Sequence, residues 1–320
     1  MTLKTQTSGY GTAHAPPSRG QQFGQAVRLQ LRAIWKCRSD YLRILPTFVL
    51  FSVFIFGPAI WTGYVSVFDW QLRGDSDFVG LGNYGKMLED EFFWLALKNT
   101  LLYTLAITTF SMLLGFVAAL LVNGLRGPLM YITRSAIFLP TILSLVVTAL
   151  IWRSFMEVDG LFERMFASIG IHSGAWLADP GLAFIAVIIV AVWQRMGYNM
   201  VFFLAGLQAI PQHLYEAAEV DGAGDWAKFI HVTIPLLRRT TLFILVMNSV
   251  TNFLMFDLVY AMTGGGPMKA TITLMVHIYN QAFRYIRYGY AGAMAIVFSA
   301  IAIAISVFQM RLLRGGEASV

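Results

Sequence analysis

The chain has 320 residues, of which 57% are apolar and only 12% are charged, and its mean hydropathy is +0.64. A soluble domain carries about a quarter charged residues, so most of this surface must face something other than water. The apolar residues also fall in long blocks, which favours membrane-spanning helices over a water-soluble core. Membrane topology and anionic lipid account for the net charge of +6, which therefore does not indicate nucleic-acid binding.

The N-terminal segment, residues 1–43, is mostly polar and is therefore not expected to act as a secretory signal. Residues 1–22 are rich in Thr, Gly, Pro, Ser and Gln and are predicted to be disordered. Residues 23–43 alternate basic and apolar positions, which predicts an interfacial helix on the inner leaflet. The single cysteine, Cys37, lies here; it excludes an intrachain disulfide and is interpreted as a cytosolic thiol without a role.

The rest of the chain to residue 312 is predicted to be an all-α membrane domain, followed by a short tail, 313–320. Only a helix satisfies its own backbone within the bilayer without closing a barrel, and about 20 residues are needed to cross it. Six intervals that are largely free of charge meet this length or approach it: 44–68, 99–125, 135–152, 180–209, 240–263 and 288–310.

The orientation follows from the Lys and Arg residues of the flanking segments. Fourteen lie on the side of the two termini and eight on the opposite side. Both termini are therefore predicted to be cytoplasmic, together with a loop of unusual pattern, residues 211–238. The last outer loop, 264–287, is rather apolar and is expected to dip partly into the membrane surface.

No catalytic or metal-binding group is predicted. The stretch GLGNYGKM at 80–87 comes close to a phosphate-binding loop, but Met87 stands where Ser or Thr should hold magnesium and no strand is expected before it. We interpret it as a glycine-rich turn. The five histidines are far apart in the sequence and none has a metal-ligand spacing. An enzyme active site is therefore not expected.

Polar residues within two of the predicted spans are candidates for function, because each costs free energy unless it lines water or meets a partner. One interpretation is a polar stripe along a substrate path. The other is hydrogen bonding that only holds helices together. Arg195 and Asp257 could also neutralise each other. The candidates are Trp193, Gln194, Arg195 and Asn199 on the fourth span, and Asn248, Asn252 and Asp257 on the fifth.

The loop 211–238 predicts two short helices with a turn between them. Good helix formers run from His213 to Glu219, and Asp221-Gly222 is typical of a helix end, because glycine tolerates the left-handed conformation. Asp225 is expected to cap the second helix, and Pro235 to mark a bend before the fifth span. The small residues Ala217 and Ala218 leave a smooth surface that suits docking of another protein.

The stretch EAAEVDGAGDWAKFIHVTIP resembles the cytoplasmic loop of permease subunits in bacterial ABC importers, E-A-A-x(3)-G-x(9)-I-x-L-P. Glu216, Ala217, Ala218, Gly222 and Pro235 match, and Val232 and Ile234 stand where Ile and Leu are usual. A second proline that is common further on is missing. The resemblance to the sugar-importing subfamily, of maltose and glycerol-phosphate type, spans about residues 44–314. It is carried further by FVGLGNY, FLAGLQAIPQHLYEAAEVDGA, FDLVYAMTGGGP and YGYAGAMA.

The resemblance implies a type I importer permease with six helices in the bacterial inner membrane. Glu216, Ala217, Ala218, Asp221, Gly222 and Pro235 would then couple the chain to an ATPase dimer. It also implies a second permease and an extracytoplasmic binding protein that delivers a sugar. ATP and Mg would bind to the ATPase and not to this chain. Residues at the positions of Trp193–Arg195, Asn248 and Asn252 line the sugar path of the maltose-type relative, which favours the substrate-path interpretation.

Two alternatives keep a transport role. Arg195 at membrane depth suits an anionic cargo, such as a glycerol phosphate ester. An ion-coupled secondary transporter would use Asp257 as its ion site, but would have no need of the loop 211–238.

Overall fold

The computed structural model of the chain describes residues 38–70, 76–158, 160–168 and 176–315. The chain divides at Trp61 into two compact units, and each is described by itself. The disorder predicted for residues 1–22 lies outside the described residues, as do the segment 23–37 of the predicted interfacial helix and most of the predicted tail.

The first unit contains α2 (Arg38–Phe51), a π-helical turn, η1 (Ser52–Phe56), and the first five residues of α3 (Gly57–Val65). Pro58 has no N–H to donate to the preceding turn, and the wider turn of η1 lies directly before it. The stretch Leu42–Val65 is long and apolar enough to cross a membrane, as expected for the first span.

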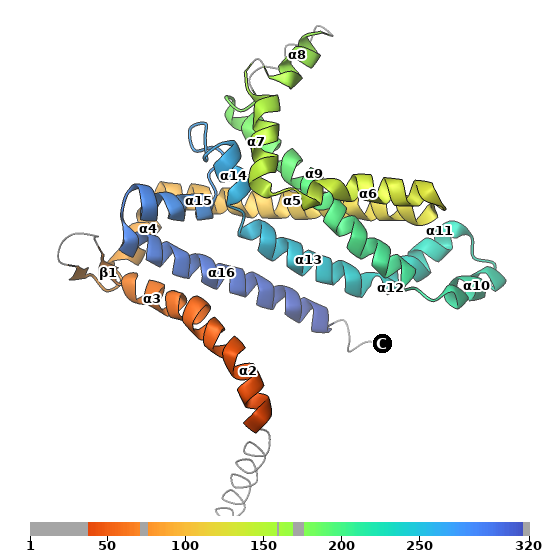
Figure 1. Cartoon of the computed structure of the whole chain (residues 1–320), viewed down its shortest axis with the longest axis horizontal. Helices are drawn as coiled ribbons and strands as arrows, with labels where there is room; N and C mark the ends of the chain where they lie inside the picture. The colour runs from red at the N-terminus through yellow and green to blue at the C-terminus, as the bar shows by residue number, and fades with distance from the viewer. Residues whose placement is uncertain (1–37, 71–75, 159, 169–175, 316–320) are drawn as a thin grey trace, which may run out of the picture. The chain divides into compact units, whose positions relative to one another are not determined.

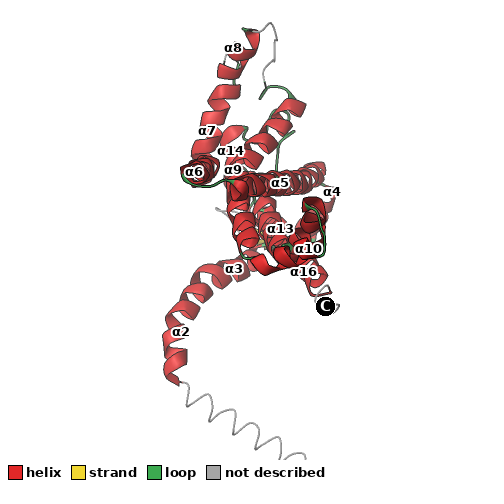
Figure 2. Ribbon diagram, turned by 90° about the vertical axis from the view of Figure 1, so that its right-hand side faces the viewer, coloured by secondary structure: helices red, strands yellow, loops and turns green. Residues whose placement is uncertain are grey.

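The described part of the second unit is almost entirely helical (Figures 1 and 2). Its long helices α5 and α9 pack against each other, and α6 and α13 pack on both of them. The elements of this unit are, in chain order, β1 (Phe68–Asp69), β2 (Asp77–Phe78), α4 (Gly82–Glu89), α5 (Glu91–Gly124), α6 (Pro128–Ile142), α7 (Leu145–Met156), α8 (Leu161–Ala167), α9 (Pro180–Gln208), α10 (Gln212–Val220), α11 (Asp225–Lys228), η2 (Phe229–Thr233), α12 (Ile234–Leu236), α13 (Arg238–Phe253), α14 (Asp257–Met262), α15 (Leu274–Tyr279), η3 (Asn280–Arg284) and α16 (Tyr288–Gly315).

The membrane-spanning helices agree in part with the prediction. Four helices of the described residues are long and apolar enough to cross a membrane, and the number rises to six if each of two bent pairs counts as one span. Helix α5 begins at Glu91, eight residues before the predicted span, because the Asp90 side chain accepts a hydrogen bond from the Phe92 N–H (2.8 Å) and caps the helix there. Absence of charge therefore locates the apolar part of a helix and not its start.

Two predicted spans are not continuous helices. The third breaks between α6 and α7, where Leu143 and Ser144 are extended and the axes of the flanking segments differ by 96°. The fifth ends at Phe253, and Asp257 starts a separate short helix, α14. Prediction of a single helix over 240–263 was therefore wrong.

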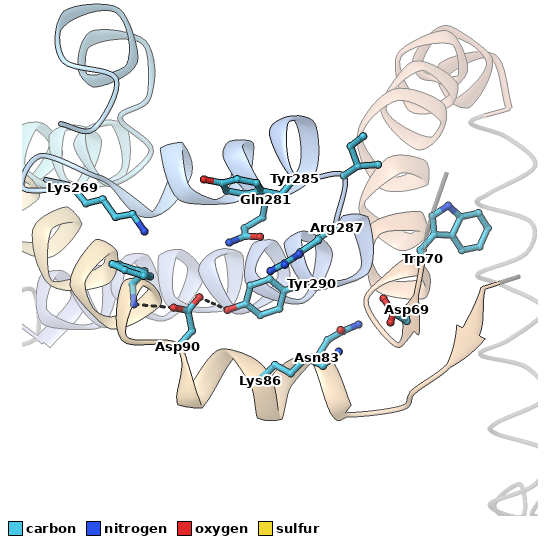
Figure 3. A pocket seen from close by; sticks show the side chains of 12 residues that line it. Asp69, Trp70, Asn83, Lys86, Asp90, Lys269, Gln281, Tyr285, Arg287 and Tyr290 are labelled. Carbon is cyan, nitrogen blue, oxygen red and sulfur yellow. Dashed lines mark hydrogen bonds between the residues drawn. The ribbon is translucent and has the colours of Figure 1, made fainter. Parts of the chain in front are cut away.

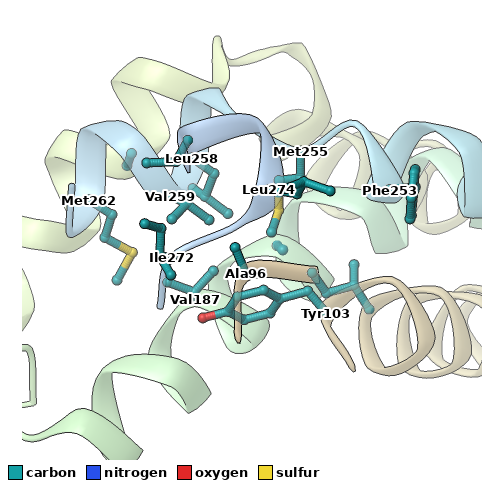
Figure 4. Close-up of a cluster of buried hydrophobic side chains, with 14 of the residues drawn as sticks. Ala96, Tyr103, Val187, Phe253, Met255, Leu258, Val259, Met262, Ile272 and Leu274 are labelled. Carbon is teal, nitrogen blue, oxygen red and sulfur yellow. The ribbon is translucent and has the colours of Figure 1, made fainter. Parts of the chain in front are cut away.

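The segment that follows α13 is part of the core. Leu258, Val259, Leu274 and Val276 are fully buried and pack against α5 and α9 (Figure 4). The outer loop expected at 264–287 is thus largely folded back into the helices, where its apolar side chains remove surface from solvent.

The glycine-rich stretch 80–87 is a turn followed by a helix, as predicted. Gly80 has a φ of +54°, and α4 starts two residues later. A two-residue strand, β2, does precede the turn and pairs with β1, which the sequence did not indicate. Asn83 fixes this hairpin, because its side-chain amide donates to the backbone carbonyls of Ser66 and Phe68, both at 2.9 Å.

Asp90 joins three helices at this end of the unit. Besides the Phe92 N–H it accepts a hydrogen bond from the Tyr290 hydroxyl (2.7 Å), and its carboxylate lies 3.4 Å from Nε2 of His277. Burial would raise the pKa of Asp90, but the hydrogen bonds from Tyr290 and Phe92 and the nearby His277 together hold it below its usual value. Burial lowers the pKa of His277 in spite of the nearby carboxylate, so this imidazole is neutral at pH 7.

This arrangement predicts a pH-dependent stability. Between pH 6.5 and the lower pKa of folded His277 the unfolded chain takes up a proton that the folded chain does not, so stability falls as the pH falls, by up to about 1.4 kcal/mol per pH unit. The stability contributed by Asp90 is lost only at pH values below the ordinary carboxyl range. We therefore expect the melting temperature of the purified protein to fall from pH 7.5 to 5.5, and His277→Gln to reduce this fall. The exposed His213 provides the control, His213→Gln; an unchanged pH dependence in His277→Gln would contradict the prediction.

Candidate functional site: the helical elbow and the buried polar network

The segment 211–236, which we call the elbow, has the helix–turn–helix structure that the sequence predicts. Helix α10 ends at Val220, and Gly222 follows with a φ of +80°. The Ala223 N–H donates to the Ala218 carbonyl (2.9 Å) and the Gly222 N–H donates to the Glu219 carbonyl (3.0 Å). These two bonds are those of a Schellman motif, which needs a left-handed residue at the position of Gly222.

Lys228 holds the two arms of the elbow together. Its Nζ donates to Glu219 of α10 at 2.7 Å and to Asp225 of α11 at 3.0 Å. The hydrogen bonds to these carboxylates raise the pKa of Lys228. Asp225 does not cap its helix as predicted: Gly224 occupies the N-cap position, and the carboxylate one residue later pairs with Lys228 instead.

The elbow then continues into the membrane helix through a bend. The chain passes from α11 through η2 into α12, which contains Pro235, and the axis changes by 56° before α13. The Tyr215 hydroxyl lies 3.0 Å from the Thr233 hydroxyl and ties α10 to this descending segment. The bend predicted at Pro235 is confirmed.

The residues predicted for coupling form an accessible surface. Glu216, Ala217, Asp221, Gly222 and Pro235 are exposed and Ala218 is half-buried. Two large apolar side chains that the sequence analysis did not select are even more open: Val220 is 88% exposed and Trp226 is 72% exposed. A tryptophan in a charged loop was the signal that could have indicated them. Exposed apolar groups on a charged surface are typical of protein interfaces.

The second group of predicted residues forms a buried polar network between α5, α9 and α13. The Asn248 amide donates to Oδ1 of Asn199 (2.7 Å), and the Asn199 amide donates to the Ser111 hydroxyl (3.0 Å). Asn252 donates to the Thr108 hydroxyl at 3.0 Å. All five side chains are at least nine-tenths buried.

This network has features of both interpretations. Its bonds connect three helices, as interhelical hydrogen bonds do. The Oδ1 atoms of Asn248 and Asn252 nevertheless have no hydrogen-bond partner, and a buried oxygen without a donor is costly. Thr108 and Ser111 were missed in the sequence; the spacing of Thr100, Thr104 and Thr108 at every fourth residue of the second span would have indicated a polar face.

The remaining predicted path residues form no hydrogen bond to this network among the described side chains. Trp193 is half-buried and its ring packs edge-on against Trp152, with the centroids 5.3 Å apart. Gln194 is buried and its backbone carbonyl accepts a hydrogen bond from Thr141. Arg195 is half-buried on the uninterrupted helix α9, whereas Asp257 is exposed at the start of α14. The structure shows no ion pair between these two described side chains, so the suggested neutralisation was wrong.

The comparisons with known proteins identify the family. Residues 111–315, which contain the elbow and all the predicted path residues, match the family described as binding-protein-dependent transport system inner membrane component. The chain belongs to this family. It is 35% identical over 277 residues to the sn-glycerol-3-phosphate transport system permease protein UgpA of Agrobacterium fabrum, covering 85% of this chain and 93% of that one. It is 32% identical over 277 residues to the lactose transport system permease protein LacF of Rhizobium radiobacter, covering 85% and 92%.

A solved structure gives the same fold. A chain of a bacterial ABC transporter involved in the import of the acidic polysaccharide alginate superimposes on this permease-family chain with a TM-score of 0.79, at 23% identity, covering 89% of this chain and 98% of that one. The predicted resemblance to importer permeases is thereby confirmed for the family and for the fold. The roles of individual residues stay predictions.

Proposed function

We propose that this chain is one permease subunit of an ATP-driven importer for a sugar or a sugar derivative. The observation that carries the proposal is the elbow: an exposed helix–turn–helix that leads through a bend into α13, in a chain whose family serves binding-protein-dependent transport. The chain would assemble with a second permease, and the two would enclose the path. A binding protein outside the membrane would deliver the cargo.

The elbow would transmit the work of the ATPase. Glu216, Ala217 and Gly222 would lie in a cleft of the ATPase dimer, with Val220 and Trp226 as apolar anchors. ATP and Mg would bind to that partner. Because Lys228 connects the two arms of the elbow, a displacement of α10 would be transmitted through α11 to α13. The two-state element is then the helix bundle, whose inward and outward forms the ATPase would bias. This requires the elbow and both termini to be cytoplasmic.

The polar network would line the path. The two unpartnered amide oxygens, on Asn248 and Asn252, would accept hydrogen bonds from sugar hydroxyls. Trp193 would offer an apolar face nearby on α9, and Gln194 and Asp257 stay predicted contributors.

Dependence on the ATPase tests this proposal. Cells that express the complete transporter should accumulate labelled sugar, and removal of the ATPase subunit alone should reduce uptake to background. Uptake that persists without the ATPase would overturn the proposal in favour of an ion-coupled transporter that uses Asp257.

A second candidate is the same machine with an anionic cargo. Arg195 favours it, because this cation sits half-buried on an apolar helix and has no acidic partner among the described residues. Comparing uptake of a neutral sugar and a polyol phosphate separates the candidates. Loss of only the anionic cargo in Arg195→Gln would support the second, and equal loss of both would contradict it.

A further inference from the structure

A large pocket lies at the end of the second unit that carries the β-hairpin, away from the elbow and the polar network. It has a volume of about 1170 Å³, somewhat above the roughly 300–1,000 Å³ of small-molecule sites, so it has room for a ligand of that size. Figure 3 shows residues of η3 and α16 facing residues of α4 across this space. Its lining comprises Asp69, Trp70, Asn83, Lys86, Asp90, Phe92, Lys269, Gln281, Tyr285, Ile286, Arg287 and Tyr290.

The charges of this pocket are unbalanced towards the positive. Lys86, Lys269 and Arg287 line it, and none of them forms an ion pair with another described residue. Lys269 instead lies over the ring of Phe92, 2.9 Å from its centroid. The pocket also has two carboxylates, Asp69 and Asp90, so its three cations exceed its anions by one. Asp90 accepts hydrogen bonds from the Phe92 N–H and the Tyr290 hydroxyl.

A buried amide supplies an independent indication of a ligand. Gln281 lines the pocket and is only 7% exposed, yet its Oε1 has no hydrogen-bond partner. Figure 3 shows the amide directed into the space between Lys269 and Arg287. A buried amide oxygen without a donor is costly, and the cost is removed when a ligand hydroxyl donates to it.

The backbone at this pocket is also held in an uncommon conformation. Lys269 and Ile286 have φ values of +63° and +59°. A positive φ is rare for a side chain that branches at Cβ, as Ile286 does. The Arg287 N–H donates to the Gln281 carbonyl at 2.8 Å, which fixes the cation beside the amide. Such conformations cluster at binding sites.

We propose that this pocket binds a hydroxylated anion, with Lys86 and Arg287 holding its phosphate or carboxylate and Gln281 accepting a hydrogen bond from its hydroxyl. Tyr285 and Trp70 would cover its apolar face, as aromatic rings do in sugar sites. In the predicted orientation the pocket opens on the outer face of the membrane. Two sources offer this chemistry: a free sugar acid or polyol phosphate on its way to the path, or the glycerol phosphate headgroup of an anionic lipid. Only the first source rests on the proposed function.

Binding to the assembled, delipidated transporter tests the proposal. Isothermal titration in detergent should show saturable binding of glycerol 3-phosphate or glucuronate and weaker binding of glycerol or glucose. Lys86→Gln and Arg287→Gln should each lower the affinity for the anions by about ten-fold, as loss of one charge-assisted hydrogen bond does, and should change the affinity for the neutral ligands little. Gln281→Leu should lower the affinity for both anions, although it leaves all charges of the pocket in place. Lys98→Gln is the matched control, because Lys98 is an exposed lysine of α5 that does not line the pocket.

A lipid arm separates the two sources. In nanodiscs of phosphatidylcholine the free anions should bind, and added phosphatidylglycerol should compete with them only if a headgroup also fits the pocket. Absence of saturable anion binding in detergent and absence of phosphatidylglycerol retention would together overturn the proposal, as would binding that the three pocket variants leave unchanged. If the pocket does not bind anions but neutral sugar is still taken up in an ATPase-dependent way, the pocket proposal fails and the proposed function stands. If the pocket binds anions but no ATPase-dependent uptake occurs, the proposed function fails and the pocket proposal stands.

Discussion

Replacing Gly222 with Asp is expected to abolish uptake while leaving the chain in the membrane. The residue has a φ of +80°, where a side chain costs about 1–2 kcal/mol, and the Schellman bonds of Ala223 and Gly222 depend on that conformation. A Cβ at this position meets no atom within 4 Å, so the chain can still fold, but the turn must change shape. The variant would present the ATPase with a distorted elbow and with a second carboxylate beside Asp221. Uptake and co-purification of the ATPase measure the effect, and both should be lost.

Gly224 offers a matched control. Gly224→Asp adds the same carboxylate two residues away, where φ is −70° and Asp is a favoured N-cap for α11. It should keep most of the uptake. Normal transport in Gly222→Asp would contradict the coupling role. Equal loss in both variants would show that the added charge matters, rather than the backbone of Gly222.

Gly115→Val is expected to destabilise the whole helical unit. Gly115 is buried on α5 where α9 passes close: a Cβ would lie 2.5 Å from Cβ of Asn199 and 3.1 Å from the Met196 carbonyl oxygen. Since neither backbone can yield locally, α5 and α9 must separate, and the hydrogen bond from Asn199 to Ser111 breaks. We expect a loss of about 2–4 kcal/mol from overpacking and the lost bond. The melting temperature of the purified protein and its amount in the membrane are the measurements.

The control for this variant lies on the same helix. Gly124→Val introduces the same side chain at the last residue of α5, where a Cβ meets nothing within 4 Å. It should change the melting temperature little. A Gly115→Val protein as stable as its parent would contradict the close packing of α5 and α9.

The elbow was predictable because its signals are local. The helix formers of 213–219, the glycine that ends α10 and the proline before α13 act within a few residues of their own position, and each has the expected effect. Asp225 was the exception. Its carboxylate can either cap the helix N-terminus or form an ion pair. It forms the ion pair, because Lys228, which also binds Glu219, lies within reach.

The breaks in the third and fifth spans were not predictable in the same way. Both intervals are free of charged residues except for Asp257, and hydropathy does not distinguish a straight helix from one that turns at Leu143 or ends at Phe253. The return of Leu274 and Val276 into the core depends on the surfaces of α5 and α9, which lie far away in the sequence.

The sequence by itself determined the class of protein, the number of apolar segments, the elbow and the family, because composition, local turn chemistry and a short motif carry that information. The tertiary structure decided which polar groups meet. Ser111 of α5 reaches Asn199 of α9 where Gly115 lets these two helices approach closely, and Thr108 of α5 reaches Asn252 on a third helix, α13. Gln281 and Lys86 line the same pocket although they are far apart in the sequence. Hydrogen bonds and cavities depend on distances between helices, and those distances result from packing.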